Sequence, residues 1–224
     1  MNTASLSDNE IFYGRSMHNV IFDLGGVVLR WSPDDILKEF YADEALRAPT
    51  KREVFQHNDW LDMDRGTLLE PDAIVRFHER TGRSRDEMSA LMQAVKDSLQ
   101  PVPETVALLE ELAGQGIPLY CLSNMPATTA DYLRQRHTFW KVFRGVVISG
   151  EIQLLKPDHE IFDHIAQRFA LTPENTVFID DHGPNIDSAT RLGFKTVHFQ
   201  TPGQCRTELF ALLNQHRNTL AGGN

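Results

Sequence analysis

Four short polar motifs, each after a separate apolar run, hold the residue types that phosphoryl transfer needs. They are Asp23-Leu24-Gly25-Gly26, Ser123-Asn124, Lys156-Pro157-Asp158 and Asp180-Asp181-His182. A carboxylate such as Asp23 has a reference pKa of ~3.9, so it is ionised at neutral pH and can attack phosphorus to form an aspartyl phosphate. Because a bare carboxylate repels a phosphate dianion, the reaction needs a cation, and the hard oxygen ligands of Asp180 and Asp181 select Mg²⁺.

The remaining motifs offer donors and positive charge to a phosphate group. Ser123 can donate its hydroxyl, and Asn124 its backbone amide, to a phosphoryl oxygen. Lys156 adds a point charge that offsets Asp23 and the transferring group. Each residue alone is also compatible with a helix cap, a turn or a solvated surface, so the prediction depends on their joint placement. We predict that Asp23 and Lys156 are catalytic and that Ser123, Asn124 and Lys156 bind phosphate.

The elements that must position these motifs are short apolar strands that alternate with helices. Strands are predicted at 18–22, 118–122, 145–148, 176–179 and 196–199, and helices at 103–115, 127–136, 158–169 and 185–192. Because the strands do not alternate with polar residues, they are typical of a parallel sheet covered on both faces. The predicted fold class is α/β, with a doubly wound, five-stranded parallel (Rossmann-like) sheet whose carboxyl edge binds the ligand.

One long interval, 33–100, contains no convincing strand. Amphipathic helical stretches are predicted there at 33–47, 51–60, 70–81 and 85–99. An insertion directly after the first strand rises from the carboxyl edge of the sheet, so 33–100 is predicted to be a small all-helical cap. The α/β core then comprises 17–32 and 101–224, with a flexible lead-in at 1–16.

The amino-acid composition limits the classes of molecule that this protein is expected to bind. The 224 residues carry 22 Lys and Arg against 31 Asp and Glu, a net charge of −9, which disfavours nucleic acid and anionic membranes. No apolar run reaches the ~18 residues of a membrane span, and the first residues lack the apolar region of a secretory signal, so a cytoplasmic location is expected. Cys121 and Cys205 are expected to be reduced packing residues. The expected partner is a small phosphorylated molecule, and the expected state a monomer or homodimer.

In this order and spacing, the four motifs resemble the haloacid dehalogenase superfamily of hydrolases. The likeness covers roughly 19–199, and the helical insert is similar to that family's first type of cap. The resemblance implies that Asp23, the backbone carbonyl of Gly25 and Asp181 coordinate Mg²⁺, with Asp180 beside the ion or behind it. It also implies that Asn185 orients the acidic loop. His182 has no assigned role, since it can act directly or only structurally.

The sequence departs from the family pattern at Gly25. Most phosphatases of the superfamily carry a second aspartate there, which protonates the leaving oxygen and then deprotonates water, a contribution of ~10²–10⁴ in rate. Its absence argues against a phosphomutase. Either the substrate has a better leaving group, such as the anomeric hydroxyl of glucose 1-phosphate, or the cap supplies a substitute acid. The first alternative fits a resemblance to the branch of α-D-glucose-1-phosphate phosphatases and epoxide hydrolase N-terminal domains.

The cap segment 57–66 has an unusual composition for a helix, with acids and amides around one tryptophan. By family position it is the loop that sets substrate specificity, so Trp60, Asp64 and Arg65 are predicted to bind substrate. Trp60 could stack on a sugar face, and Asp64 or His57 could supply the missing proton. The alternative is a solvated helix end with Trp60 packed on the core.

These observations favour a Mg²⁺-dependent phosphatase acting on a small phosphorylated metabolite through an aspartyl phosphate. A 2-haloacid dehalogenase uses the same carboxylate but needs no metal and usually replaces the acidic loop, so Asp180 and Asp181 argue against it. A weakly active binding or regulatory protein is the third alternative. The joint presence of four residues speaks against this third alternative: Asp23, Ser123, Lys156 and Asp181.

Overall fold

Five parallel strands form the central sheet of the computed structural model, which describes residues 19–221. In spatial order β3-β2-β1-β4-β5, the strands are β3 (Phe143–Ile148), β2 (Leu119–Ser123), β1 (Asn19–Phe22), β4 (Thr176–Asp180) and β5 (Lys195–His198). The sheet confirms the predicted fold class. The predicted lead-in at 1–16 lies outside the described residues.

The order of the strands creates the ligand-binding edge. The chain moves outward from β1 to β3 and then returns to the other side of β1 as β4. Phe22 at the end of β1 therefore pairs with Cys121 of β2 and with Ile179 of β4. Because open parallel sheets bind ligands at the carboxyl ends of strands where the winding reverses, the residues that follow β1, β2 and β4 share one site.

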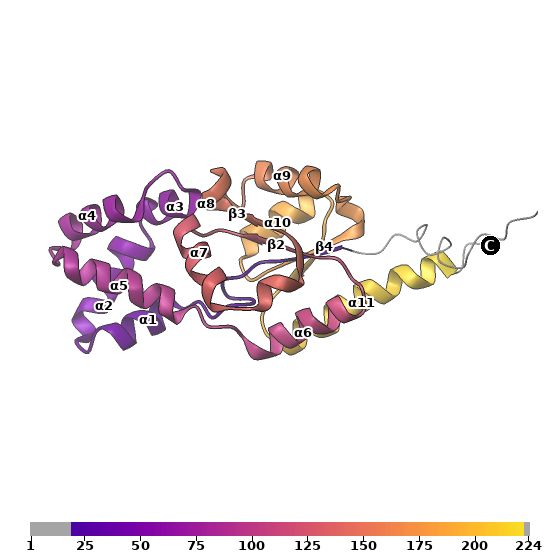
Figure 1. Cartoon of the computed structure of the whole chain (residues 1–224), viewed down its shortest axis with the longest axis horizontal. Helices are drawn as coiled ribbons and strands as arrows, with labels where there is room; N and C mark the ends of the chain where they lie inside the picture. The colour runs from indigo at the N-terminus through magenta and orange to yellow at the C-terminus, as the bar shows by residue number, and fades with distance from the viewer. Residues whose placement is uncertain (1–18, 222–224) are drawn as a thin grey trace, which may run out of the picture.

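Helices cover both faces of the sheet (Figure 1). One face packs on α6 (Pro103–Gly114), α7 (Ala127–Arg136) and α11 (Pro202–Ala221), and the other on α9 (His159–Phe169) and α10 (Gly183–Arg191). Val20 and Phe22 of β1 face the first layer and Ile21 the second, as the two-residue period of a strand requires. Shorter elements complete this part, namely η4 (Phe139–Val142), α8 (Ser149–Ile152) and η5 (Pro173–Asn175).

Between β1 and α6 the named elements of the described chain are all helices. The elements are α1 (Pro33–Phe40), η2 (Glu44–Leu46), α2 (Arg47–Thr50), the π-helical turn η3 (Lys51–Phe55), α3 (Asn58–Arg65), α4 (Glu70–Thr81) and α5 (Arg85–Ser98). They enclose their own apolar cluster, which includes Leu37, Val54 and Phe77, and they lie at one end of the molecule (Figure 1). We call this helical segment the cap.

Two helices expected in the cap are shorter than predicted. The helix expected over 33–47 ends at Phe40, because Tyr41 adopts an extended backbone. The stretch expected over 51–60 breaks after Phe55, and a new helix begins at Asn58 with His57 as its N-cap. After this break, α3 lies against the core, where the Ser149 hydroxyl at the start of α8 donates to the carbonyl of Asp64 in α3.

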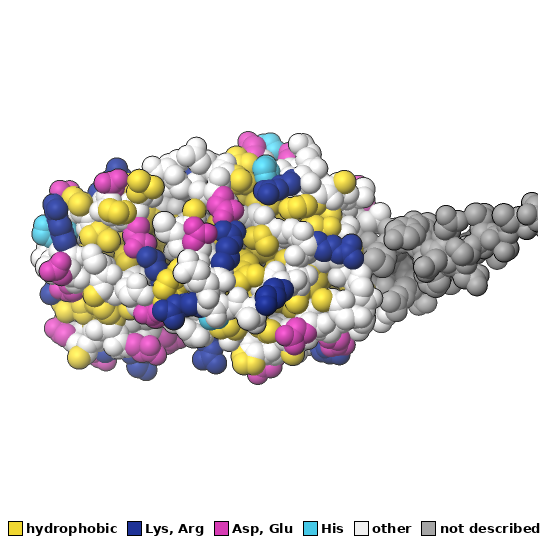
Figure 2. Space-filling view, viewed as in Figure 1, with side chains coloured by type: hydrophobic (Ala, Val, Ile, Leu, Met, Phe, Trp, Pro, Cys, Tyr) yellow, Lys and Arg dark blue, Asp and Glu magenta, His cyan; other side chains and the backbone are white. Residues whose placement is uncertain are grey.

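The visible surface mixes charges of both signs (Figure 2). Acidic and basic side chains lie side by side over the cap and the core, in keeping with many surface ion pairs such as Lys51 with Asp34 and Arg134 with Glu151. None of the helices within 19–221 combines the length and the apolar character that crossing a bilayer demands.

Candidate active site

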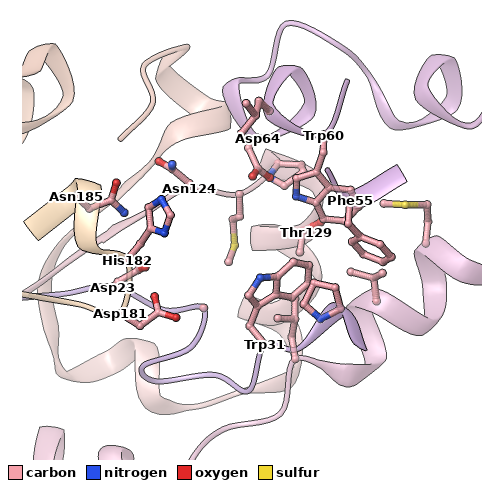
Figure 3. Close-up of a pocket in the computed structure, with 18 residues that line it drawn as sticks. Asp23, Trp31, Phe55, Trp60, Asp64, Asn124, Thr129, Asp181, His182 and Asn185 are labelled. Atoms are coloured by element: carbon pink, nitrogen blue, oxygen red, sulfur yellow. The ribbon is translucent and has the colours of Figure 1, made fainter. Parts of the chain in front are cut away.

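A cavity of about 390 Å³ lies between the carboxyl edge of the sheet and the cap (Figure 3). Its polar lining comes from the loops after β1, β2 and β4 and from three helices, α3, α7 and α10. The polar or small residues are Asp23, Gly25, Asp64, Asn124, Thr129, Asp181, His182 and Asn185. The volume is within the range of small-molecule sites. The topology therefore brings three of the four sequence motifs to the wall of one cavity.

Lys156 is the buried cation of the site. Its Nζ lies 3.0 Å from Asp23 Oδ1 and 2.6 Å from Asp180 Oδ2, and it donates to the carbonyl of Leu122 at 3.0 Å. Burial lowers the pKa of Lys156, but the attraction of Asp180 and Asp23 outweighs it and holds the pKa above its usual value. Lys156 is therefore charged and directed at Asp23.

Asn124 holds the backbone of Lys156 in place. The Asn124 Nδ2 donates to the Lys156 carbonyl at 2.9 Å, and the Lys156 amide donates to Asn124 Oδ1 at 2.9 Å. Both polar atoms of the Asn124 side chain are thus hydrogen-bonded to the backbone of Lys156. The Asn124 side chain therefore positions the backbone of Lys156, while the predicted contact of its backbone amide with phosphate stays a prediction.

Asp180 lies behind the cavity wall, fully buried. Its oxygen atoms accept from Lys156, from the His182 amide at 2.8 Å, and from Asn185 Nδ2 at 3.0 and 3.1 Å. The bonds from Asn185 agree with the prediction that this residue orients the acidic loop. Because protein donors already occupy both oxygens, Asp180 fixes Lys156 and the loop from behind.

Asp23, Asp180 and Asp181 bring carboxylate oxygens within 4.8 Å of one another. Burial raises the pKa of Asp23. Lys156 lowers this pKa, whereas the negative charges of Asp180 and Asp181 raise it further. Burial and then Asp180 also raise the pKa of Asp181. A cluster with more carboxylates than cations, built of hard oxygen donors, fits a divalent ion such as Mg²⁺.

Gly26 permits the close approach of Asp181. Its φ is +75°, and a Cβ at this position would lie 2.0 Å from Asp181 Oδ2. Any side chain at this position would therefore displace the Asp181 carboxylate. The second glycine of the first motif is required by sterics as well as by its backbone conformation.

Like the buried Lys156 and Asp180, two further predicted site residues, Ser123 and Arg65, do not line the cavity. Ser123 ends β2 with 1% of its surface exposed and is not part of the lining, so its contact with phosphate stays a prediction. Arg65 points to the core outside the cavity, where its guanidinium lies 3.3 Å from Asp158. The structure thus places Arg65 in the contact between cap and core.

The cap contributes Trp60 and Asp64 to the lining, both from α3. Burial raises the pKa of Asp64 to about 7, with Lys156 acting in the opposite direction. His57, the other candidate proton donor, does not line the cavity, and its Nδ1 accepts from the Asp59 amide at 3.1 Å. The structure therefore separates the two candidates in favour of Asp64.

The rest of the lining is apolar, and most of it was not predicted. It comprises Trp31, Pro33, Phe55, Trp60, Leu61, Met92, Val95, Leu99, Met125 and Pro126. Trp60 stacks on Trp31 with ring centroids 5.7 Å apart and packs on Phe55 at 4.8 Å. This agrees with the alternative prediction that Trp60 packs on the core. Trp31 lies close to the first motif in sequence, but no spacing rule indicates that it meets residues of the cap.

Comparison with known proteins gives a consistent picture. A family model described as a haloacid dehalogenase-like hydrolase matches residues 17–193. Sesquiterpene phosphatase astK of Aspergillus oryzae is 28% identical over 178 residues, which are 80% of this chain and 87% of that protein. D-ribitol-5-phosphate phosphatase of Bacteroides thetaiotaomicron is 24% identical over 207 residues, 88% of this chain and 98% of that one.

A solved structure supports the fold. The chain is similar to a HAD family enzyme of Bacteroides thetaiotaomicron in complex with magnesium and inorganic phosphate, with a TM-score of 0.64 and 21% identity. The match covers 82% of this chain and 94% of the other.

Proposed function

The chain belongs to the haloacid dehalogenase-like hydrolases, and we propose that it is a Mg²⁺-dependent phosphatase that hydrolyses a small phosphate monoester through an aspartyl phosphate on Asp23. The observation that carries the proposal is the buried contact of Lys156 with both Asp23 and Asp180 beside the cavity. The phosphatases among the relatives support the same reaction class.

In the first step a carboxylate oxygen of Asp23 attacks phosphorus, and the bond from phosphorus to the ester oxygen breaks. Lys156 holds Asp23 in position and offsets the charge of the transferring group. Ser123 and the backbone at Asn124 are proposed to donate to the phosphoryl oxygens. Asp64, protonated below its pKa of about 7, donates its proton to the departing alcohol oxygen.

In the second step water attacks the phosphorus of the aspartyl phosphate. Asp64, now ionised, accepts a proton from that water, the bond between Asp23 and phosphorus breaks, and inorganic phosphate leaves. Asp64 thus does the work that an aspartate at Gly25 does in most phosphatases of the superfamily. The two steps restore both carboxyl groups to their starting states.

We infer that Asp23, the backbone carbonyl of Gly25 and Asp181 would hold Mg²⁺. When bound, the ion neutralises the excess negative charge of the carboxylates and of the phosphoryl group. Asp180 supports this set from behind, because its oxygens are already bonded to Lys156 and Asn185.

The proposed reaction does not specify which alcohol carries the phosphate group. The sequence suggests a small metabolite, such as a sugar phosphate and in particular glucose 1-phosphate, and a cytoplasmic monomer or homodimer as the acting form. The names of the relatives include both a sesquiterpene and ribitol 5-phosphate, which differ greatly in polarity. The cap residues Trp60 and Asp64 are proposed to contact this part of the substrate.

The test is turnover of p-nitrophenyl phosphate with Mg²⁺, without it, and with a chelator. We expect Mg²⁺-dependent release of phosphate, and for Asp23→Asn a loss of more than about 10³-fold in kcat. Chloride release from 2-chloropropionate without metal would instead identify a dehalogenase. Absence of both activities would indicate a binding or regulatory protein.

A further inference from the structure

The cavity is polar at one end and apolar at the other. Figure 3 shows Asp23, Asp181 and His182 on one side and Trp31, Phe55 and Trp60 on the other, with Asp64 extending from the cap between them. The polar end is the proposed site of phosphoryl transfer. Whatever alcohol carries the phosphate must therefore extend toward the aromatic end.

The apolar end is a preformed surface. Trp31, Phe55 and Trp60 contact one another, with Trp31 and Phe55 centroids 6.1 Å apart and their rings at 63°. Met92 and Val95 of α5, both buried, complete it from the cap. These residues come from both sides of the boundary between core and cap, so the surface exists only where the two meet.

We propose that the substrate is the phosphate monoester of an apolar alcohol, of alkyl or prenyl character, whose hydrocarbon chain lies against Trp31, Phe55, Trp60 and Leu61. This inference rests on the proposed phosphatase function and specifies its substrate class. A hydrocarbon chain gains free energy by leaving water for such a lining, up to about fourfold in affinity for each buried methylene group.

A sugar phosphate fits the same surface poorly. At the apolar end the side-chain polar groups of the lining are the Thr129 hydroxyl and the indole N–H groups of Trp31 and Trp60. A hexose brings several hydroxyls, each of which loses water on binding and needs a partner. In addition, Trp60 already packs against two aromatic rings, Trp31 and Phe55.

The experiment compares esters of primary alcohols with the full-length protein and Mg²⁺. We expect kcat/KM to rise from methyl through butyl to octyl phosphate and to be at least about 100-fold higher for octyl phosphate than for glucose 6-phosphate. These two esters share the type of leaving group, so the difference reports the lining. Hydrolysis with no dependence on chain length, or faster hydrolysis of glucose 6-phosphate, would overturn the inference and leave the phosphatase function intact.

Two exposed leucines of the cap provide matched variants. Leu61, 49% exposed, lines the cavity, whereas Leu69, 66% exposed, does not. We expect Leu61→Gln to lower the ratio of kcat/KM for octyl over methyl phosphate by about tenfold, and Leu61→Met and Leu69→Gln to keep the ratio of the parent protein. Equal ratios for Leu61→Gln and Leu69→Gln would contradict the inference. Failure to hydrolyse any of the esters would instead remove the phosphatase function on which it rests.

Discussion

At the level of single residues, the proposed mechanism combines Asp23 as nucleophile with a proton donor from a different segment, Asp64 of the cap. Gly25 stands where most phosphatases of the superfamily carry an aspartate. A Cβ at Gly25 would lie 3.8 Å from Trp31, an ordinary contact, so the missing side chain is not excluded by lack of space. Asp64 instead enters the cavity from the cap, and burial raises its pKa into the range of a general acid at neutral pH.

We expect Asp64→Asn to lower kcat/KM for octyl phosphate by about 10²–10⁴-fold. The loss with p-nitrophenyl phosphate is expected to be much smaller, because its leaving group departs without protonation. Since a general acid acts only when protonated, activity of the parent protein toward octyl phosphate should decline as pH rises through about 7, the pKa of Asp64. In Asp64→Asn this decline should disappear.

A second substitution checks the same assignment. The φ of Gly25 lies outside the left-handed region, and a Cβ there would make only an ordinary van der Waals contact with Trp31. We expect Gly25→Asp to restore part of the octyl phosphate activity in the Asp64→Asn background. Equal losses with the two esters, without rescue, would show that Asp64 has only a structural role.

At the level of elements, α3 determines the site because it carries both Trp60 and Asp64. The Ser149 hydroxyl at the start of α8 donates to the Asp64 carbonyl and accepts from the Met125 amide at 2.9 Å, which ties α3 to the core. Gly66 ends α3 with φ of +79°, and a Cβ there would lie 2.4 Å from the Gly150 carbonyl oxygen. This close backbone approach sets how α3 sits over the sheet.

Gly66→Ala and Gly82→Ala form a matched pair at this level. Both glycines end cap helices in the left-handed conformation, but a Cβ at Gly82 meets nothing within 4 Å. We expect Gly82→Ala to cost about 1 kcal/mol in the free energy of unfolding and to spare activity. Gly66→Ala should cost about 2–3 kcal/mol and also lower kcat/KM, because α3 must move away from the core. Urea unfolding and kinetics measure both, and equal effects would refute the contact.

At the level of the whole molecule, negative charge is dispersed over the surface and also gathers at the carboxyl edge of the sheet, where two of three neighbouring carboxylates are buried. The chain has a net charge of −9, and acidic and basic side chains alternate over the visible face (Figure 2). At the carboxyl edge, Asp23, Asp180 and Asp181 converge near the ammonium group of Lys156. These three carboxylates repel one another in the folded state, and a bound cation would relieve that repulsion.

Mg²⁺ is therefore expected to stabilise the protein. At a concentration of 100 times its dissociation constant, it should add about 2.7 kcal/mol to the free energy of unfolding and raise Tm. Asp181→Asn should lose most of this shift, whereas Asp187→Asn, at an exposed position of α10, should retain it. Thermal unfolding with and without Mg²⁺ measures the difference, and an undiminished shift in Asp181→Asn would exclude that ligand.

Prediction from the sequence was accurate where local signals dominate. The helices expected at 70–81 and 127–136 coincide with α4 and α7, and all five expected strands are present. It was inaccurate where tertiary contacts dominate. The helices expected from 33 and from 51 end early at Phe40 and Phe55.

The sequence by itself determined the catalytic edge of the protein, because motifs after parallel strands must meet where those strands end. Asp23, Asp180 and Asp181 could be placed together on this ground alone. Only the tertiary structure decided between Asp64 and His57 and brought Trp31 beside Trp60. Both results depend on how the cap packs on the core, through contacts such as that of Gly66 with Gly150. The hydrophobic period of a helix or strand does not specify which side chains meet across the boundary between cap and core.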